Sequence, residues 1–209
     1  MMDHYSTAYG GVMVVDFSPS VKVETLDAPL GTFVLGDSGE PKDTKGILAR
    51  VKNQVLDASE ELRRKFPRFS LQTVRIEDLR RYRAALSEEK YTLLEGTVRN
   101  RDITRRARLM LRQKPLDHKT LGSMLSEHHR VLRDALRIST KKIDRMIDEA
   151  MSAGAFGGKI NGSGGGGCMF AYAPENTKDV ARAIERCGGK PYIVTSDRGT
   201  RLDDQEPGR

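Results

Sequence analysis

The sequence predicts an α+β fold with antiparallel sheets, and three observations support this prediction. Short apolar runs separated by turns occupy residues 11–37, a pattern typical of strands. Residues 44–150 then carry apolar positions at helical spacing. From residue 157 the expected order is strand, strand, helix and strand. Because strands and helices are segregated along the chain, the helices should form a layer on an antiparallel sheet.

The first segment contains three candidate strands. They are Val12–Val15, Val21–Leu26 and Thr32–Leu35, and the second of them alternates apolar and polar residues at period two. Pro19 and the turn Pro29–Gly31 separate the runs. We therefore expect antiparallel pairing among these strands.

The middle of the chain predicts a series of helices. Apolar positions repeat at helical spacing over residues 44–66, and Pro67 ends that helix. Two more helical stretches cover residues 76–86 and 88–112, and Pro115 marks the next break. Asp117 should cap a helix that reaches about Leu136, and Ser139 should open a helix with an apolar inner face.

The last third returns to strands. Gly158–Asn161 leads into a glycine run, and Cys168–Ala173 follows as an apolar strand. Asn176 should cap a short helix that stops at Gly188-Gly189. Pro191–Thr195 is the last predicted strand, followed by a polar tail.

Composition narrows the class of protein. The 209 residues carry a net charge of +7, and much of the excess lies on one predicted helix. Aromatic residues are 6% and Trp is absent, so the stacking platforms of many nucleic-acid binders are missing. A solvated helix face is the favoured interpretation; an anionic-substrate or partner surface and nucleic-acid binding are the alternatives. The basic residues are Arg99, Arg101, Arg105, Arg106, Arg108, Arg112 and Lys114.

The cellular location follows from what the sequence does not contain. No apolar run approaches the ~18 residues of a membrane span, and Met1–Tyr5 lack the order of a signal peptide. Cys168 and Cys187 belong to no metal-binding pattern. Two reduced thiols in a cytoplasmic protein are expected.

The run Gly162–Gly167 is the strongest local signal. It formally matches GxGxxG, but a dinucleotide fingerprint opens a helix, whereas this run precedes an apolar strand. It also lacks the Lys-Ser/Thr of a P-loop. Five glycines in six residues indicate positive φ or close backbone approach, and successive amides in such a turn can bind an anion. A flexible hairpin loop without a ligand remains the alternative.

The longer string Gly157–Cys168 resembles the third conserved motif of the GHMP kinases. Leu121–Asp134 is similar to a helix of the family's galactokinase branch that reads roughly LGxLMxESHxSLRD. Met2–Tyr5, followed by Ala8–Gly11, resembles the pattern around the galactokinase catalytic aspartate. Asp37–Gly39 precedes a long helix, as does the linker between the family's two domains. The similarity extends over most of residues 1–195.

The resemblance implies ATP-dependent phosphorylation of a small-molecule hydroxyl, with a sugar as the expected substrate. It implies that Asp3 accepts or orients the substrate proton, and that Asp37, Ser38 and Gly39 lie on the substrate side. ATP and Mg²⁺ are the implied cofactors, and no metal ligand is assigned within the chain. His128 and His129 are expected to be packing or surface residues. The residues implied to lie near the ATP phosphates are Gly162, Ser163, Gly164, Gly165, Gly166 and Gly167.

Departures from the family limit the prediction. His4 replaces the usual Gln, and residues 36–51 contain no Tyr where galactokinases place a sugar-contacting one. The family's second motif, a PxxxGLGSSA-like phosphate loop, does not occur in the sequence. We therefore expect residues 1–40 to be a remnant of the N-terminal domain, 41–196 the C-terminal, ferredoxin-like domain, and 197–209 a polar tail.

A chain of this kind is expected to be inactive alone. Its partners would be the substrate and either the N-terminal half as a separate chain or a homodimer partner, with no nucleic acid and no membrane. A catalytically inactive ligand- or partner-binding module and a basic adaptor remain as alternatives. Mevalonate and homoserine are the alternative substrates.

Overall fold

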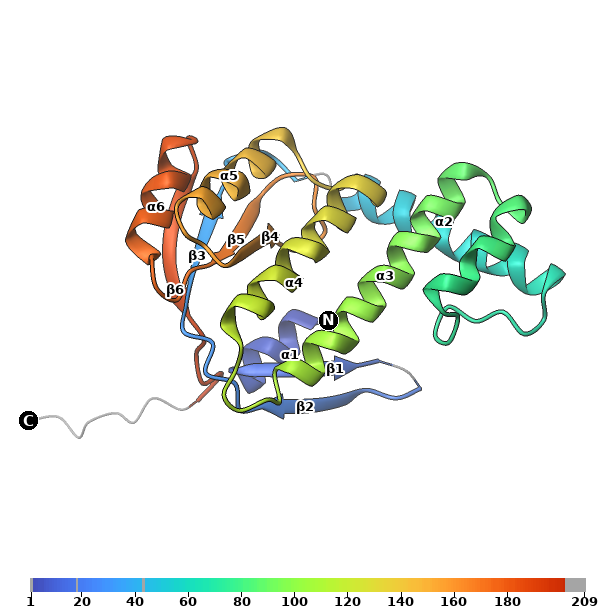
Figure 1. The fold of residues 1–209 in the computed structure, drawn as a ribbon, viewed down its shortest axis with the longest axis horizontal. Coiled ribbons are helices and arrows are strands. Elements are labelled where there is room, and N and C mark those ends of the chain that lie inside the picture. Colours follow the sequence, from blue (N-terminus) through green and yellow to red (C-terminus); the bar gives the residue numbers. More distant parts are fainter. Residues whose placement is uncertain (1, 18, 43, 202–209) are drawn as a thin grey trace, which may run out of the picture.

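The computed structural model describes residues 2–17, 19–42 and 44–201. Helical elements and strands alternate in blocks, as the sequence predicts (Figure 1). Besides α-helices, the described chain contains the 3-10 helix η1 and the π-helical turn η2. In chain order the elements are α1 (Met2–Tyr9), β1 (Val12–Asp16), β2 (Lys22–Leu26), β3 (Thr32–Asp37), α2 (Thr44–Lys65), η1 (Ile76–Ala85), α3 (Glu88–Met110), α4 (His118–Arg130), η2 (Val131–Ala135), α5 (Lys141–Ser152), β4 (Gly157–Ile160), β5 (Cys168–Tyr172), α6 (Thr177–Arg186) and β6 (Lys190–Thr195).

The main sheet has four strands in the order β4-β5-β3-β6, and all neighbouring pairs are antiparallel. β1 and β2 form a separate hairpin. β3 was expected to pair with that hairpin, and this expectation is wrong: β3 lies between β5 and β6. The predicted division at residue 40 therefore separates β3 from the sheet to which it belongs. A short apolar run after a turn predicted the strand, but such a run does not encode which distant strand will pair with it.

One face of the sheet is covered by α5 and α6 (Figure 1). Val34, Met169 and Ala171 point into this layer and are fully buried. Gly36 lies among them, and a Cβ there would be 2.8 Å from Met146 Cε and 2.9 Å from Ile184 Cγ2. Since real Cβ atoms do not approach that closely, the helices pack tightly on β3 because this position is glycine.

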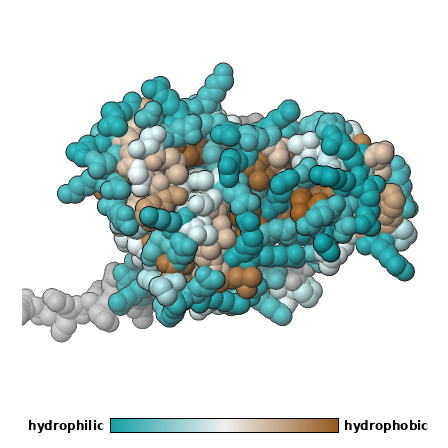
Figure 2. Space-filling model, in the orientation of Figure 1, coloured by the Kyte–Doolittle hydropathy of each residue, from teal (hydrophilic) through white to brown (hydrophobic). Residues whose placement is uncertain are grey.

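Apart from α1, the remaining helices form an elongated layer beside the sheet. α2, η1 and α3 pack together at one end of the molecule, and α4 lies between α3 and β4 (Figure 1). Polar residues cover most of the face shown in Figure 2, with smaller apolar patches among them. None of the described helices is long and apolar enough to cross a membrane.

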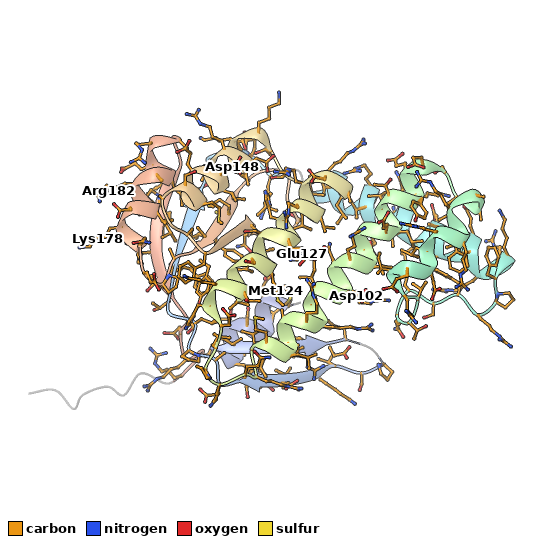
Figure 3. The ribbon with its side chains drawn as sticks, viewed as in Figure 1. Asp102, Met124, Glu127, Asp148, Lys178 and Arg182 are labelled. Carbon is orange, nitrogen blue, oxygen red and sulfur yellow. The ribbon has the colours of Figure 1, made fainter. Side chains whose placement is uncertain are left out.

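Basic residues in α3 and just after it form ion pairs with acidic side chains. Arg106 pairs with Glu127 of α4, which is labelled in Figure 3. Arg108 and Arg112 both pair with Glu24 of β2. These ion pairs hold the hairpin and α4 against α3, so much of the positive charge has a structural use within the chain.

Two local predictions need correction. Ser139 was expected to open α5, but the N-cap is Thr140, whose side chain accepts a hydrogen bond from Ile143 N–H. The segment after residue 196 was expected to be a polar tail. Its described part returns to α1 and the turn before β1, where Thr200 N–H donates to Thr7 O and Gly11 N–H donates to Asp197 O. Residues 202–209 of the predicted tail lie outside the described residues.

Candidate functional site

The glycine run joins β4 to β5, so it connects two antiparallel strands and opens no helix. Gly162, Gly164, Gly165 and Gly167 have φ values between 72° and 84°, and Gly166 has φ of 117°. Side chains with a Cβ rarely adopt these conformations. The sequence pattern predicted this use of glycine, and the structure confirms it.

The loop is fastened to the segment that follows β3. Ser38 is 1% exposed, and both its N–H (2.9 Å) and its Oγ (2.6 Å) donate to Gly167 O. Gly167 N–H in turn donates to Glu40 O at 3.0 Å. Asp37 Oδ1 accepts from Gly39 N–H and shapes the turn. Two of the predicted site segments, distant in sequence, therefore form one surface.

A second segment supports the middle of the loop. Gly165 N–H donates to Ile138 O at 2.7 Å. A Cβ on Gly164 would lie 2.4 Å from the same Ile138 oxygen, and a Cβ on Gly166 would lie 2.5 Å from Pro41 O. Since both obstacles are backbone atoms, they cannot rotate away. The loop is thus held between residues 41 and 138 only because it lacks side chains.

The loop offers unpaired donors next to lysines. Gly164 and Gly166 are buried, and their N–H groups have no hydrogen-bond acceptor among the described residues. Lys42 lies across the loop: its Nζ is 2.9 Å from where a Gly162 Cβ would be. Lys142 Nζ donates to Ser38 O at 2.5 Å. Buried backbone donors normally have partners, so these amides are suited to an anion such as a phosphate group.

The sequence analysis did not identify either lysine. Lys42 follows the Asp37–Gly39 turn by three residues, and that proximity was the available signal. Lys142 gave no signal, because its place beside Ser38 depends on how α5 packs against the sheet.

Two titratable groups lie near the loop. Burial and the Asp37 carboxylate raise the pKa of the Cys168 thiol, which makes this cysteine a poor nucleophile at neutral pH. Burial lowers the pKa of Lys159 to about 8. The Lys159 ammonium donates to Ile160 O at 2.8 Å and lies 5.2 Å from the Phe170 ring centroid. A lysine in this state loses part of its charge in mildly alkaline solution.

Asp3 is not brought to the glycine loop. It is an exposed residue of α1, and its carbonyl accepts from Ser6 Oγ within the same helix. α1 lies with the β1–β2 hairpin at the lower edge of the view, whereas the chain from β3 into α2 passes the upper edge (Figure 1). The catalytic role of Asp3 stays a prediction.

The sequence analysis assigned no metal ligand within the chain. Among the described residues, no three His, Cys, Asp or Glu side chains are grouped so that they could hold a metal ion. The donors at the glycine loop are amides and ammonium groups, which fit the phosphates of ATP but not Mg²⁺. The chain's own residues thus fit one of the two implied cofactors.

Known proteins resemble this chain in its second half. Residues 107–192 match the family model described as GHMP kinases C terminal. A mevalonate kinase of Thermococcus onnurineus is 48% identical over 88 residues, which cover 42% of this chain and 26% of the relative. A galactokinase of Bos taurus is 32% identical over 110 residues, covering 52% of this chain and 28% of the relative. The matches thus span about a quarter of the length of these relatives.

Solved structures extend the likeness in fold to nearly the whole chain. Lactococcus lactis galactokinase, complexed with galactose, aligns with a TM-score of 0.78 and 17% identity over 95% of this chain and 54% of its own. The mevalonate kinase of L. major, in complex with R-mevalonate, aligns with a TM-score of 0.57 and 18% identity over 92% and 51%. Both likenesses concern the fold alone.

Residues 107–192 are thus similar to the C-terminal part of GHMP kinases, and the fold, with helices on an antiparallel sheet, is like that of a galactokinase. The resemblance inferred from the motifs is therefore confirmed. The relatives include both galactokinases and mevalonate kinases.

Proposed function

We propose that this chain forms part of an enzyme that transfers the terminal phosphoryl group of ATP to a hydroxyl of a small molecule. The observation that carries the proposal is the glycine loop with its unpaired buried amides, held against Ser38 and crossed by Lys42. Phosphoryl transfer depends on positioned phosphates and neutralised charge, and this loop has the donors for both. ATP would supply the phosphoryl group.

The residues at and around the glycine loop have distinct roles in this proposal. The amides of Gly164 and Gly166 donate to phosphate oxygens, and Lys42 offsets their charge. Ser38 and Gly39 fix the conformation of the turn on the substrate side of the loop. Asp3 accepts the proton of the acceptor hydroxyl, which requires α1 and the glycine loop to face one cleft in the active protein. The remaining phosphate and Mg²⁺ contacts would come from an N-terminal half, in the same chain or in a second one.

A sugar is our first choice of substrate. The fold matches galactokinase with the higher of the two TM-scores, 0.78 against 0.57. Mevalonate is the second candidate, because the mevalonate kinase match has the higher identity, 48% against 32%. Both substrates offer a hydroxyl, so the proposed loop chemistry is the same for either.

Transfer of radiolabelled phosphate from ATP to galactose, mevalonate or homoserine tests the proposal. We expect no appreciable turnover by the chain alone, and turnover of one acceptor when a GHMP kinase N-terminal segment is supplied in cis or in trans. Lys42→Met should weaken ATP binding about tenfold, as loss of one charge-assisted contact predicts. As the control, Lys52→Met changes an exposed lysine of α2.

Two results would contradict the proposal. Failure to bind ATP, with or without the N-terminal segment, would favour the non-catalytic module. Robust turnover by the 209 residues alone would refute the need for a second segment.

A further inference from the structure

Backbone N–H groups on the outer edge of β4 find their hydrogen-bond acceptors on a helix. Within the described sheet β4 pairs only with β5, so the backbone groups on its other side need partners elsewhere. α4 runs along this edge (Figure 1). Gly158 N–H donates to Ser126 Oγ at 3.3 Å, and Ile160 N–H donates to His129 Nδ1 at 3.4 Å. Two side chains of α4 thus take the place of a neighbouring strand.

This arrangement depends on an unusually close approach of helix and strand. A Cβ on Gly122 would lie 2.3 Å from Phe156 O, and a Cβ on Gly157 would lie 1.8 Å from Gly122 O. Residues 122, 126 and 129 follow one another at spacings of four and three, so they share a face of α4. The glycine contact brings that face close enough for Ser126 and His129 to reach the strand.

His129 also holds the other support of the glycine loop. It is 4% exposed, and its Nε2 lies 3.0 Å from Asp144 Oδ1. Because Nδ1 accepts from a backbone N–H, the proton is on Nε2 and is donated to Asp144. Ser139 Oγ donates to the same carboxylate oxygen at 2.6 Å. The neighbouring residue, Ile138, is the one whose carbonyl holds Gly165 N–H.

His129 therefore connects both sides of the loop. Through Ile160 it fixes the strand that enters the glycine run, and through Asp144 and Ser139 it fixes the segment that holds the middle of the run. Both imidazole nitrogens are engaged, so the ring is not available as an acid, a base or a metal ligand. Its burial also lowers its pKa, which favours the neutral ring that this arrangement needs.

We propose that Ser126 and His129 are positioning residues of the phosphate site: they hold the edge of β4 and thereby aim the glycine-loop amides at an anion. This inference rests on the function proposed above. It explains why the motif Leu121–Asp134 and the glycine motif occur in one chain. The first motif supplies Ser126 and His129, the hydrogen-bond acceptors for β4, and β4 leads into the glycine run.

Two substitutions of His129 separate its two contacts. An Asn amide can place its oxygen near the position of Nδ1, so His129→Asn keeps an acceptor for Ile160 N–H. A Gln amide can place its nitrogen near Nε2, so His129→Gln keeps a donor to Asp144 but leaves Ile160 N–H unpaired. Ser126→Ala removes the acceptor of Gly158 alone. Amide hydrogen exchange and ATP affinity should be measured on the same samples.

We expect His129→Gln to speed exchange at Ile160 about tenfold or more, and to weaken ATP binding by a similar factor. His129→Asn should keep Ile160 protected, with faster exchange at Gly165 because the Asp144 side is released. Ile103→Val, which trims a buried residue of α3, is the control for a general loss of stability. It should leave ATP affinity unchanged.

The outcomes separate this inference from the proposed function. Unchanged exchange at Ile160 in His129→Gln overturns the inference, as does an ATP affinity that follows global stability as it does in Ile103→Val. If the unsubstituted protein does not bind ATP either alone or with the N-terminal segment, the proposed function fails. In that case faster amide exchange at Ile160 in His129→Gln and at Gly165 in His129→Asn would still support His129 as the residue that positions the loop.

Discussion

Gly166→Ala tests whether close backbone contact requires the glycine loop to lack side chains. Gly166 has φ of 117°, and an added Cβ would lie 2.5 Å from Pro41 O and 3.1 Å from Glu40 O. The conformational strain should cost about 1–3 kcal/mol. The clash with backbone atoms that cannot rotate away should add about 1–3 kcal/mol. We expect a combined loss of about 2–6 kcal/mol in the free energy of unfolding.

Gly39→Ala is the matched control. Gly39 also has a positive φ, 67°, and lies in the same site, but a Cβ there would meet nothing within 4 Å. Its left-handed conformation costs Ala about 1–2 kcal/mol, partly offset by about 0.4–1 kcal/mol from the stiffer unfolded chain. Because both positions carry a positive φ, the difference between the two variants reports mainly the steric contact.

Thermal and urea unfolding measure both variants. For a chain of this size about 1 kcal/mol shifts Tm by about 2–4 °C, so Gly39→Ala should lower Tm by a few degrees and Gly166→Ala by about twice that or more. Equal losses in the two variants would refute the argument, because the contact with Pro41 would then contribute nothing. If Gly166→Ala leaves the ATP affinity unaltered, the contact with Pro41 stabilises the fold but does not contribute to phosphate binding.

The other predictions concern catalysis, pH and the hairpin. In the active protein, Asp3→Asn should lower kcat by about 10²-fold or more with little change in ATP affinity; a near-normal kcat would move the base elsewhere. Burial first, and then Lys159 and His129, lower the pKa of His128 to about 4. An unfolded His titrates near 6.5, so the unfolded chain binds more protons between pH 6.5 and 4, and urea unfolding should show stability falling as the pH is lowered through that range. His128→Asn should flatten this dependence, and an equally steep profile would contradict the assignment. Glu24→Gln should speed hydrogen exchange in β1 and β2, because Arg108 and Arg112 lose their shared partner; unchanged exchange would show that other contacts hold the hairpin.

Several elements could be predicted from the sequence because their causes are local. Apolar spacing and the prolines located α2 and α3 to within a few residues. Asp117 was expected to cap α4, and its side chain accepts from Thr120 N–H at 3.0 Å. The glycine run was expected between two strands because it precedes an apolar stretch with no helical pattern, and it does join β4 to β5. In each case the signal and the structure lie within one short segment.

The candidate site was predicted in part. The sequence identified the glycine run and the Asp37–Gly39 turn as separate features, each with a plain turn as its alternative. Their contact through Ser38 and Gly167 could not be predicted, because those hydrogen bonds continue the pairing of β3 with β5, two strands that are distant in sequence. Lys42 was missed for the same reason: a lysine after a turn is common, and only its place across the loop distinguishes it.

From residue 12 onward the sequence by itself determined which segments are helical or extended, which face of each is apolar, and where glycine is needed, whereas the helix α1 was not predicted. Only the tertiary structure decided that β3 joins β5 and β6 instead of the hairpin, and that His129 accepts from Ile160 while it donates to Asp144. The physical reason is that periodicity records whether a side chain will be buried, whereas the covering segment is chosen by shape and by hydrogen-bond partners far away in the chain. A buried polar residue such as His129 acquires its role only when the elements around it have packed.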